Sequence, residues 1–372
     1  MNPKSVSLIL YIALISLQLN EQEKNCTDET ILGKKGIWKQ SDFITSFYES
    51  RNKEKYGEAQ KIVSNIADIF INLIPEPAGM EPKWWGSERN PVIPGGPLAY
   101  DFNSDYLKYF CAKNTNELLL GFETGTWIYA HINSGGYVFQ MYDTLEIKGK
   151  PELIYQLPKR AGTWEGHTWF LQPDIGKHSA LGRSVILHRP GEVPYHILTQ
   201  KEFLLGLKKR LEGKKEKQIR LMDDLETELA NNIEKLNDFD NLKSQFMENY
   251  RKELEKYKQN KSGQQNKLTG MFDAEIFKIE NYLSTASAKE LGKPAITGNG
   301  DTFSGFFDRE NEFAQLMVRY NTDYFKKDLP LYVPQFMVLL FRYDVHPAAL
   351  QMKKIIDDNF PLQMLEDMID NP

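Results

Sequence analysis

The chain is poor in the features that identify many enzyme and nucleic-acid-binding classes. Only two of its 372 residues are cysteine and only six are histidine. It contains no phosphate-binding loop, no dinucleotide-binding glycine motif and no H-E-x-x-H pair. Acidic and basic residues nearly balance, at a net charge of −5, so no strongly basic face is expected. We therefore expect no cofactor, no metal and no nucleic-acid partner.

Long apolar runs are also scarce, and the clearest one, Val6–Leu17, lies at the N-terminus. Lys4 precedes this run and polar residues follow it, which is the layout of a secretory signal peptide. A membrane-spanning helix needs about 20 apolar residues, so the run is short for an anchor. We predict a signal peptide over residues 1–20 and a periplasmic or extracellular protein that meets the membrane only during export. An uncleaved anchor is the alternative.

The two cysteines, Cys26 and Cys111, both follow the predicted signal peptide. In an oxidising compartment they could form a disulfide that closes a loop of about 84 residues. The chain-entropy model assigns such a cross-link about 4–5 kcal/mol of stability. Two free thiols are the alternative. An activated nucleophile is not expected, because no histidine or basic cluster adjoins either cysteine.

Residues 21–80 are predicted to form an N-terminal helical segment. Apolar side chains recur there at every third or fourth position, as one face of a helix requires. Proline cannot donate the next helical hydrogen bond, so we place the helix at Ser41–Pro75. The Pro- and Gly-rich stretch Pro77–Pro97 is predicted to be an irregular connection.

Residues 81–199 are predicted to form a β-rich body. From Glu117 the period of alternation becomes two, which is typical of strands. Asn133–Gly136 and Pro190–Gly191 have the composition of tight turns, so each is expected to join neighbouring strands as a hairpin. The expected result is an antiparallel meander. Its strands are expected near 127–132, 137–147, 152–157, 168–172, 183–188 and 193–198.

Residues 200–288 are predicted to form an inserted, protruding helical hairpin that resembles a coiled coil. Thr199 begins a capping-box pattern, and charged residues of both signs surround an apolar seam. We predict a turn at Asn237–Asn241 and an irregular break at Lys261–Gly270. A single unbroken helix that turns at Asn260–Gln265 is the alternative.

Residues 289–372 are predicted to complete the body, so the fold class is α+β: an antiparallel sheet packed with helices and interrupted by the hairpin. Asn311–Tyr320 is predicted to be a helix and Tyr332–Tyr343 a buried strand. Pro347–Asp358 and Leu362–Ile369 are predicted to be terminal helices.

Two segments resemble exported proteins of Bacteroidota-type bacteria. They are Thr199–Leu204, which leads into the charged hairpin, and Asp328–Tyr343, which contains Asp328-Leu329-Pro330 and Pro334-Gln335-Phe336. Gln200 departs from the pattern, where a basic residue is expected. The resemblance implies export and a similar outline, and it supplies no activity.

The segment Gly162–Trp169 concentrates residues that suit chemistry on sugars. Its candidates are Trp164, Glu165, His167 and Trp169. Tryptophan rings stack on sugar rings, and Glu165 beside His167 could transfer protons. Glycoside hydrolysis also needs a second carboxylate about 5–9 Å away. Glu123, Asp174 and Asp301 are the carboxylates considered for that role. The alternative is that Trp164 and Trp169 form the core of a strand pair.

Trp84-Trp85 is a further candidate ligand surface, with half-buried packing as the alternative. Five of the six histidines lie between His131 and His196, but their spacing matches no metal-ligand motif. His188 and His196 flank the Pro190–Gly191 turn and could face one another across a hairpin, but a structural or surface role is favoured for the histidines.

The sequence favours a non-enzymatic binding or interaction module that contacts a protein partner, or a second copy of itself, through the helical hairpin. The alternative is an extracytoplasmic hydrolase acting on a glycan or peptide through Glu165 and His167.

Overall fold

The structure is a computed structural model, and it combines helices with large antiparallel sheets, which confirms the α+β class. It describes residues 26–41, 53–113, 117–122, 125–171, 181–237, 244–298 and 302–371. The predicted signal peptide at residues 1–20 and most of the predicted turn at Asn237–Asn241 lie outside these residues.

The chain divides into two compact units. The first unit takes its residues from Met1–Val138, Arg160–Pro194 and Thr322–Pro372. The second takes Phe139–Lys159 and Tyr195–Asn321. The segment predicted as one β-rich body is thus shared between the two units.

The first unit is built on a sheet whose described strands are antiparallel, except that β1 and β2 run parallel. In spatial order its strands are β1 (Lys39–Gln40), β2 (Met80–Arg89), β3 (Ala99–Cys111), β5 (Trp127–Ile132), β14 (Phe336–Tyr343), β10 (Leu181–His188), β9 (His167–Leu171) and β8 (Arg160–Trp164), and β4 (Leu118–Leu120) pairs with β3. β14 comes from the C-terminal part of the chain and lies between β5 and β10, so the sheet is assembled from distant segments.

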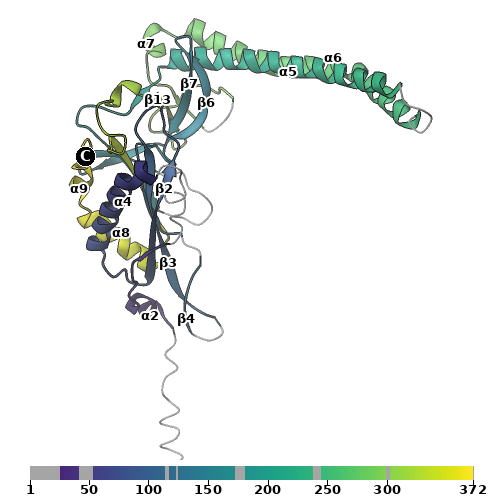
Figure 1. The fold of residues 1–372 in the computed structure, drawn as a ribbon. Coiled ribbons are helices and arrows are strands. Elements are labelled where there is room, and N and C mark those ends of the chain that lie inside the picture. The colour runs from purple at the N-terminus through teal and green to yellow at the C-terminus, as the bar shows by residue number, and fades with distance from the viewer. Residues whose placement is uncertain are drawn as a thin grey trace, which may run out of the picture. The chain divides into compact units, whose positions relative to one another are not determined.

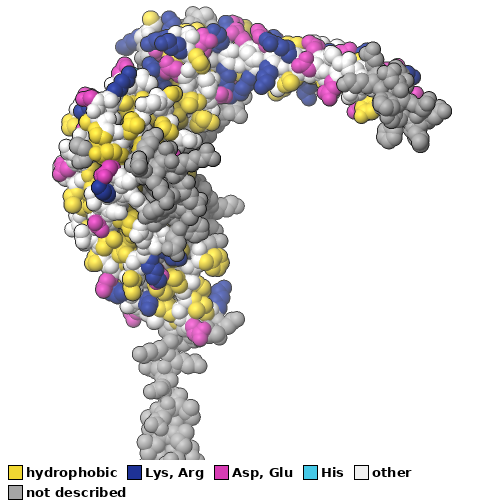
Figure 2. Space-filling view, in the orientation of Figure 1, with side chains coloured by type: hydrophobic (Ala, Val, Ile, Leu, Met, Phe, Trp, Pro, Cys, Tyr) yellow, Lys and Arg dark blue, Asp and Glu magenta, His cyan; other side chains and the backbone are white. Residues whose placement is uncertain are grey.

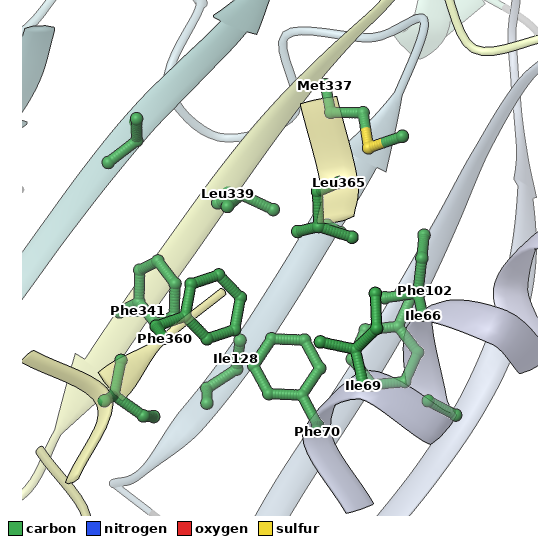
Figure 3. Packing of buried hydrophobic residues seen from close by; sticks show 14 of the residues in the cluster. Ile66, Ile69, Phe70, Phe102, Ile128, Met337, Leu339, Phe341, Phe360 and Leu365 are labelled. Carbon is green, nitrogen blue, oxygen red and sulfur yellow. The ribbon is translucent and has the colours of Figure 1, made fainter. Parts of the chain in front are cut away.

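One face of this sheet packs against the helices of the first unit (Figure 1). These helices are α2 (Asp28–Gly33), α4 (Lys53–Leu73), α8 (Pro347–Asn359) and α9 (Leu362–Glu366), and a 3-10 turn, η1, covers Thr322–Tyr324. Phe70 of α4 lies between Phe102 of β3 and Phe360, with ring centres 5.4 and 5.1 Å away (Figure 3). Burial of each such side chain contributes about 1.5–3 kcal/mol, so this helical layer stabilises the sheet.

The second unit carries its own sheet and core. Its strands are β11 (Tyr195–Ile197), β13 (Gln315–Tyr320), β7 (Lys150–Leu157) and β6 (Gln140–Ile147), and β12 (Ile296–Thr297) also pairs with β13. Its helices are α5 (Gln200–Asn237), α6 (Ser244–Thr285) and α7 (Ala288–Leu291). Phe203 and Leu207 of α5 and Ile279 of α6 share a buried cluster with Leu145 of β6, so the first turns of α5 and the last turns of α6 pack on this sheet.

The capping box at the start of α5 is confirmed. The backbone N–H of Glu202 donates to Oγ1 of Thr199 at 3.2 Å, and the backbone N–H of Thr199 donates to Oε2 of Glu202 at 3.0 Å. Burial would raise the pKa of Glu202, but the hydrogen bonds from Thr199 and the nearby Lys148 outweigh burial and lower it. The carboxylate therefore stays ionised at the positive end of the helix dipole.

Two predictions of irregular or helical structure are wrong because strand pairing overrides local composition. Pro77–Pro97 contains β2, whose ten residues pair with β3 along their full length. Asn311–Tyr320 contains β13, which pairs with β7, β11 and β12. Its Gln, Leu and Met residues favour helix in isolation, but hydrogen bonds from three neighbouring strands decide the outcome.

The predicted break at Lys261–Gly270 is also wrong, because α6 continues through it. Gly263 and Gly270 each weaken an exposed helix by about 1 kcal/mol, which pairing with α5 offsets. A single helix turning at Asn260–Gln265 is equally wrong, since α5 ends at Asn237.

The two predicted hairpins do not form. β5 and β6, which flank Asn133–Gly136, belong to different sheets, and so do β10 and β11, which flank Pro190–Gly191. His188 and His196 therefore do not face one another across a strand pair. Glycine and proline in these turns specify a reversal of the backbone, but they do not specify which strands pair afterwards.

Candidate functional site

The segment around Glu165 is a β-hairpin between β8 and β9, in which Trp164 pairs with His167. Glu165 and Gly166 are its turn residues, with φ values of +48° and +87°. Glu165 is exposed, whereas Nε2 of His167 lies 2.9 Å from Oε1 of Glu366 on α9. His167 thus connects the hairpin to α9. The carboxylates considered as partners for Glu165, namely Glu123, Asp174 and Asp301, lie outside the described residues.

Trp164 and Trp169 both pack against the core of the first unit. The ring of Trp164 lies 5.7 Å from that of Phe341 and 5.8 Å from that of Phe360. The guanidinium carbon of Arg183 lies 3.7 Å from the centre of the same ring, a cation–π contact. These contacts assign the two tryptophans to packing.

Trp84 and Trp85 lie on opposite faces of β2, as neighbours in a strand must. Trp84 packs against the core, with its ring 6.3 Å from that of Phe102. Trp85 is partly exposed and pairs with Asn103 of β3. Only Trp85 therefore lies on the sheet face away from the helices.

The histidines are dispersed over the fold. His131 lies in β5, His188 at the end of β10, His196 is exposed in β11, and His346 caps α8 by accepting the backbone N–H of Ala349. His178 lies outside the described residues.

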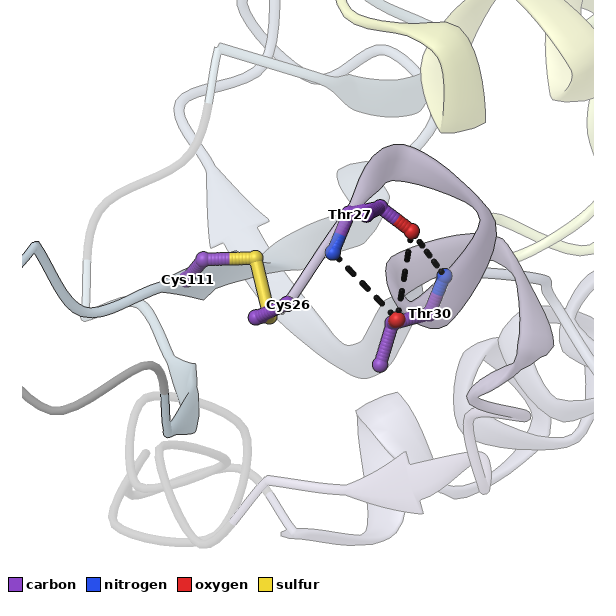
Figure 4. The surroundings of a disulfide bond; sticks show 4 residues. All are labelled: Cys26, Thr27, Thr30 and Cys111. Atoms are coloured by element: carbon purple, nitrogen blue, oxygen red, sulfur yellow. Dashed lines mark hydrogen bonds between the residues drawn. A yellow bond between two sulfur atoms is a disulfide. The ribbon is translucent and has the colours of Figure 1, made fainter. Parts of the chain in front are cut away.

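Cys26 and Cys111 form a disulfide in the structure, with Cα atoms 5.5 Å apart (Figure 4). Thr27 and Thr30 build a capping box at the start of α2 directly after Cys26 (Figure 4). The bond connects this N-terminal turn to the end of β3. A disulfide of this kind is compatible with an exported protein.

α5 and α6 lie side by side in antiparallel orientation (Figure 1). Ion pairs join them at successive levels: Lys208–Glu280 at 2.6 Å, Lys215–Asp273 at 2.5 Å and Lys261–Asp223 at 2.7 Å. In addition, the Tyr257 hydroxyl donates to the backbone oxygen of Met222 at 2.8 Å. Residue numbers rise along one helix as they fall along the other, so the two helices are antiparallel. The ion pairs fix their register.

Each of the two helices has a mainly basic stretch and a mainly acidic stretch. Residues 201–220 carry eight basic and three acidic side chains, whereas residues 221–237 carry one basic and five acidic. On α6, residues 268–285 carry one basic and three acidic side chains, and residues 244–267 carry six and three. Antiparallel pairing therefore sets opposite charges against each other, and parallel pairing would not.

The seam between α5 and α6 is only partly enclosed. Between Lys208 and Lys278, no side chain that the structure describes is buried. The seam alternates apolar residues such as Leu211 and Ile219 with charged ones such as Lys215. Figure 2 shows mainly charged and other polar side chains on this face of the pair, with hydrophobic ones between them. Two helices alone cannot surround a core, so a surface of mixed character stays accessible.

A second polar constellation lies in the first unit, on the sheet face opposite the helices. We call it the Asp101 cluster: Ser87, Arg89, Asp101, Asn103 and His131. Ser87, Asp101 and His131 are direct neighbours across β2, β3 and β5. Nδ1 of His131 lies 2.7 Å from Oδ1 of Asp101, and Oγ of Ser87 donates to Oδ2 at 3.2 Å. Nε of Arg89 also donates to Oδ2 of Asp101.

The cluster stabilises the charged form of Arg89. Burial would lower the pKa of this guanidinium, but the Asp101 carboxylate and the Tyr137 hydroxyl more than offset burial and raise it. The guanidinium carbon lies 5.4 Å from the centre of the Tyr137 ring. Nε2 of His131 is buried and has no hydrogen-bond partner among the described residues. The Asp101 carboxylate can only accept, so Nδ1 of His131 is the donor in this contact.

Three members of the Asp101 cluster, Ser87, Arg89 and Asp101, line an open cavity of about 670 Å³. The cavity, which we call the Arg89 pocket, is lined by Ser87, Glu88, Arg89, Asn90, Asp101 and Ser134. A second cavity of about 410 Å³ lies in the second unit, among aromatic side chains that include Tyr142, Phe203, Phe303, Phe307 and Phe313.

No protein-family model matches this chain, and no curated protein or solved structure is significantly similar to it. Within the described ranges, no group of three or more His, Cys, Asp or Glu side chains is placed to hold a metal ion. Among the helices that the structure describes, none is both long and apolar enough to cross a membrane. Any proposal of function therefore depends on how the residues are arranged in this structure.

Sequence reasoning missed Asp101, Arg89 and the whole strand β3. A signal was present, since Asp101, Asn103 and Asp105 alternate with Tyr100, Phe102, Ser104 and Tyr106, three of which are aromatic. Such alternation indicates a strand with one apolar face and one polar face. The register that places Asp101 beside His131 has no comparable signal in the sequence.

Proposed function

We propose that this chain is an exported, non-enzymatic interaction module whose contact surface is the pair of helices α5 and α6. The observation that carries the proposal is the combination of a register fixed by charge with a seam that is only partly enclosed. Such a pair is held in one arrangement, yet it keeps accessible apolar and charged side chains for a partner.

We interpret the pair as a protruding, coiled-coil-like hairpin. Partly buried positions on α5 recur at Leu211, Lys215, Ile219, Met222, Glu226 and Leu229. Their spacing of three and four residues is that of a heptad seam. At 1.5 Å per residue, helices of 38 and 42 residues extend about 57–63 Å. A rigid arm of that length would reach a protein partner, or a second copy of the chain, at a distance from the unit that carries it.

The compartment is part of the same proposal. The disulfide Cys26–Cys111 favours an oxidising environment, and the short apolar run Val6–Leu17 has the layout of a signal peptide. Both features support a periplasmic or extracellular location. We do not propose the hydrolase alternative, because Glu165 occupies a hairpin turn and His167 is engaged with Glu366.

The test removes the arm and keeps its base. Replacing Glu216–Met271 by a short Gly-Ser linker retains the Lys215–Asp273 ion pair and the cluster of Phe203, Leu207 and Ile279. We expect the truncated chain to keep its cooperative melting transition and to lose association. Sedimentation measures self-association, and chemical cross-linking from the helices in living cells measures contact with a partner. Association that is unchanged in the truncated chain contradicts the proposal.

A pair of point variants locates the contact. Leu221 and Leu225 are exposed apolar residues one turn apart on α5, so Leu221→Lys combined with Leu225→Lys should weaken association without lowering the melting temperature. The matched control is Thr227→Lys combined with Asn231→Lys, which adds the same charges at the same spacing on another face of α5.

A further inference from the structure

The Arg89 pocket lies entirely within the first unit, so it is separate from the helix pair. All six residues that line it are polar. Its volume of about 670 Å³ lies within the range of about 300–1,000 Å³ typical of small-molecule sites. An apolar ligand would leave these polar groups without partners, which costs free energy. The lining therefore selects a hydrogen-bonding ligand.

The charges in the lining disfavour anionic ligands. One guanidinium, from Arg89, stands against two carboxylates, from Glu88 and Asp101. Asp101 is only 1% exposed and lies within hydrogen-bond distance of Arg89, His131 and Ser87, so its carboxylate balances the charge of the guanidinium. An anion would then be repelled by Glu88. A ligand with many hydroxyl groups suits both kinds of charged side chain, because a hydroxyl donates to a carboxylate and accepts from a guanidinium.

Arg89 is positioned before any ligand arrives. Its Nε is bonded to Asp101, so the terminal amino groups are the part of the guanidinium that a ligand can meet. Holding the side chain in place removes much of the entropy cost of ordering it on binding. Ser87 is fixed in the same way, since Nδ2 of Asn103 donates to its hydroxyl at 3.0 Å.

An aromatic ring stands beside these polar groups. Tyr137 is 55% exposed, and its ring centre lies 5.4 Å from the guanidinium carbon of Arg89 and 6.3 Å from the ring centre of Tyr129. A pyranose ring has a rim of hydroxyl groups and faces made of C–H bonds. The hydroxyl rim suits Arg89, Asn90 and Glu88, and a C–H face packs well on an aromatic ring. We infer that the Arg89 pocket binds a saccharide without acidic groups.

The experiment measures binding of named sugars to the purified full-length chain. An immobilised panel of neutral oligosaccharides of glucose, galactose, mannose and N-acetylglucosamine identifies a binder, and titration calorimetry gives its Kd. We expect Tyr137→Ala and Asn90→Ala each to weaken binding about tenfold or more, equivalent to about 1.4 kcal/mol. Phe277 is exposed and belongs to the second unit, so Phe277→Ala is the matched control and should leave Kd unchanged. Thermal melting of each variant shows whether it is folded.

Three results would overturn the inference. The first is that no sugar of the panel binds at about 10 mM, a concentration at which even a 1 mM site is mostly occupied. The second is that a sugar binds equally well to the Tyr137→Ala and Asn90→Ala variants. The third is that sodium acetate or phosphate, and no neutral sugar, binds in a manner that depends on these residues, which would make the pocket an anion site. A chain that lacks the helix pair is expected to bind the sugar with an unchanged Kd, because the pocket and the helices belong to different units.

Discussion

Nδ1 of His131 lies 2.7 Å from Oδ1 of Asp101, and the two side chains are 0% and 1% exposed. A carboxylate this deeply enclosed is stable only with partners, and here it also receives hydrogen bonds from Arg89 and Ser87. The pair joins neighbouring strands β3 and β5 in the middle of the sheet. The cluster thus stabilises the first unit as well as positioning Arg89.

Asp101→Ala should therefore destabilise the first unit strongly. The substitution leaves the partly exposed Arg89 and the buried His131 without their acceptor, and hydrogen bonds to a charged group contribute about 1.5–3 kcal/mol each. Urea unfolding followed by tryptophan fluorescence measures the change. Ser87→Ala removes one hydrogen bond to Asp101 and one from Asn103 but leaves the charged groups paired, so it should cost only about 1–2 kcal/mol. Equal losses in the two variants would show that Asp101 does not hold the cluster together.

The ring of His131 packs directly against Gly136. A Cβ atom at this position would lie 1.8 Å from Cδ2 and 2.2 Å from Nε2 of His131, and the backbone has φ of +51°. Gly136→Ala should displace the histidine and lower the melting temperature. Gly95→Ala is the matched control, because Gly95 has φ of +70° and open space around it. The control carries the strain of the left-handed conformation alone, so a larger effect at Gly136 isolates the steric clash.

Asp105 should make stability depend on pH. Burial raises its pKa, and the hydrogen bond from Tyr129 at 3.2 Å offsets only part of that rise. The folded state then binds this proton more tightly than the unfolded state, so stability is lost as pH rises from the unfolded pKa of about 3.9 through the higher folded pKa. Asp105→Asn keeps an acceptor for Tyr129 and should raise the free energy of unfolding near pH 7 but not near pH 3. The exposed Asp308→Asn serves as control. An equal gain at both pH values would contradict the stated cause.

Reduction of the Cys26–Cys111 bond should lower the free energy of unfolding by about 4–5 kcal/mol, because the unfolded chain regains the entropy that a loop closure over 85 residues removes. Urea unfolding with and without reductant, and of the double variant Cys26→Ser with Cys111→Ser, measures the effect. The double variant must not respond to reductant. If the intact chain is equally insensitive, the two cysteines are free thiols.

Local signals in the sequence located several elements correctly. Alternation identified β5, and the capping box at Thr199 identified the start of α5, since each pattern reflects contacts within a few residues. β13 was mistaken for a helix because its strand identity comes from β7 and β11, which are distant in sequence. Long-range pairing overrides propensities worth only a few tenths of a kcal/mol per residue.

The Asp101 cluster was not predictable for a related reason. Its members come from β2, β3 and β5, and they meet only when three strands adopt one register. A shift of one residue would move Asp101 to the helix-covered face and disperse the cluster. Composition indicates polar residues in a strand, but it carries no information on that register.

The charge pattern of the helix pair predicts its response to charge reversal. Lys215 and Asp273 lie 2.5 Å apart across α5 and α6. Lys215→Asp sets two carboxylates against each other, and Asp273→Lys sets two ammonium groups against each other, so each should lower stability by about 0.2–1 kcal/mol at low salt. The double variant restores an opposite pair in reversed order and should recover most of the loss, as a double-mutant cycle in urea measures. Added salt should shrink both single effects. If the double variant loses the sum of the two single effects, these side chains do not meet, and the register of the pair is different.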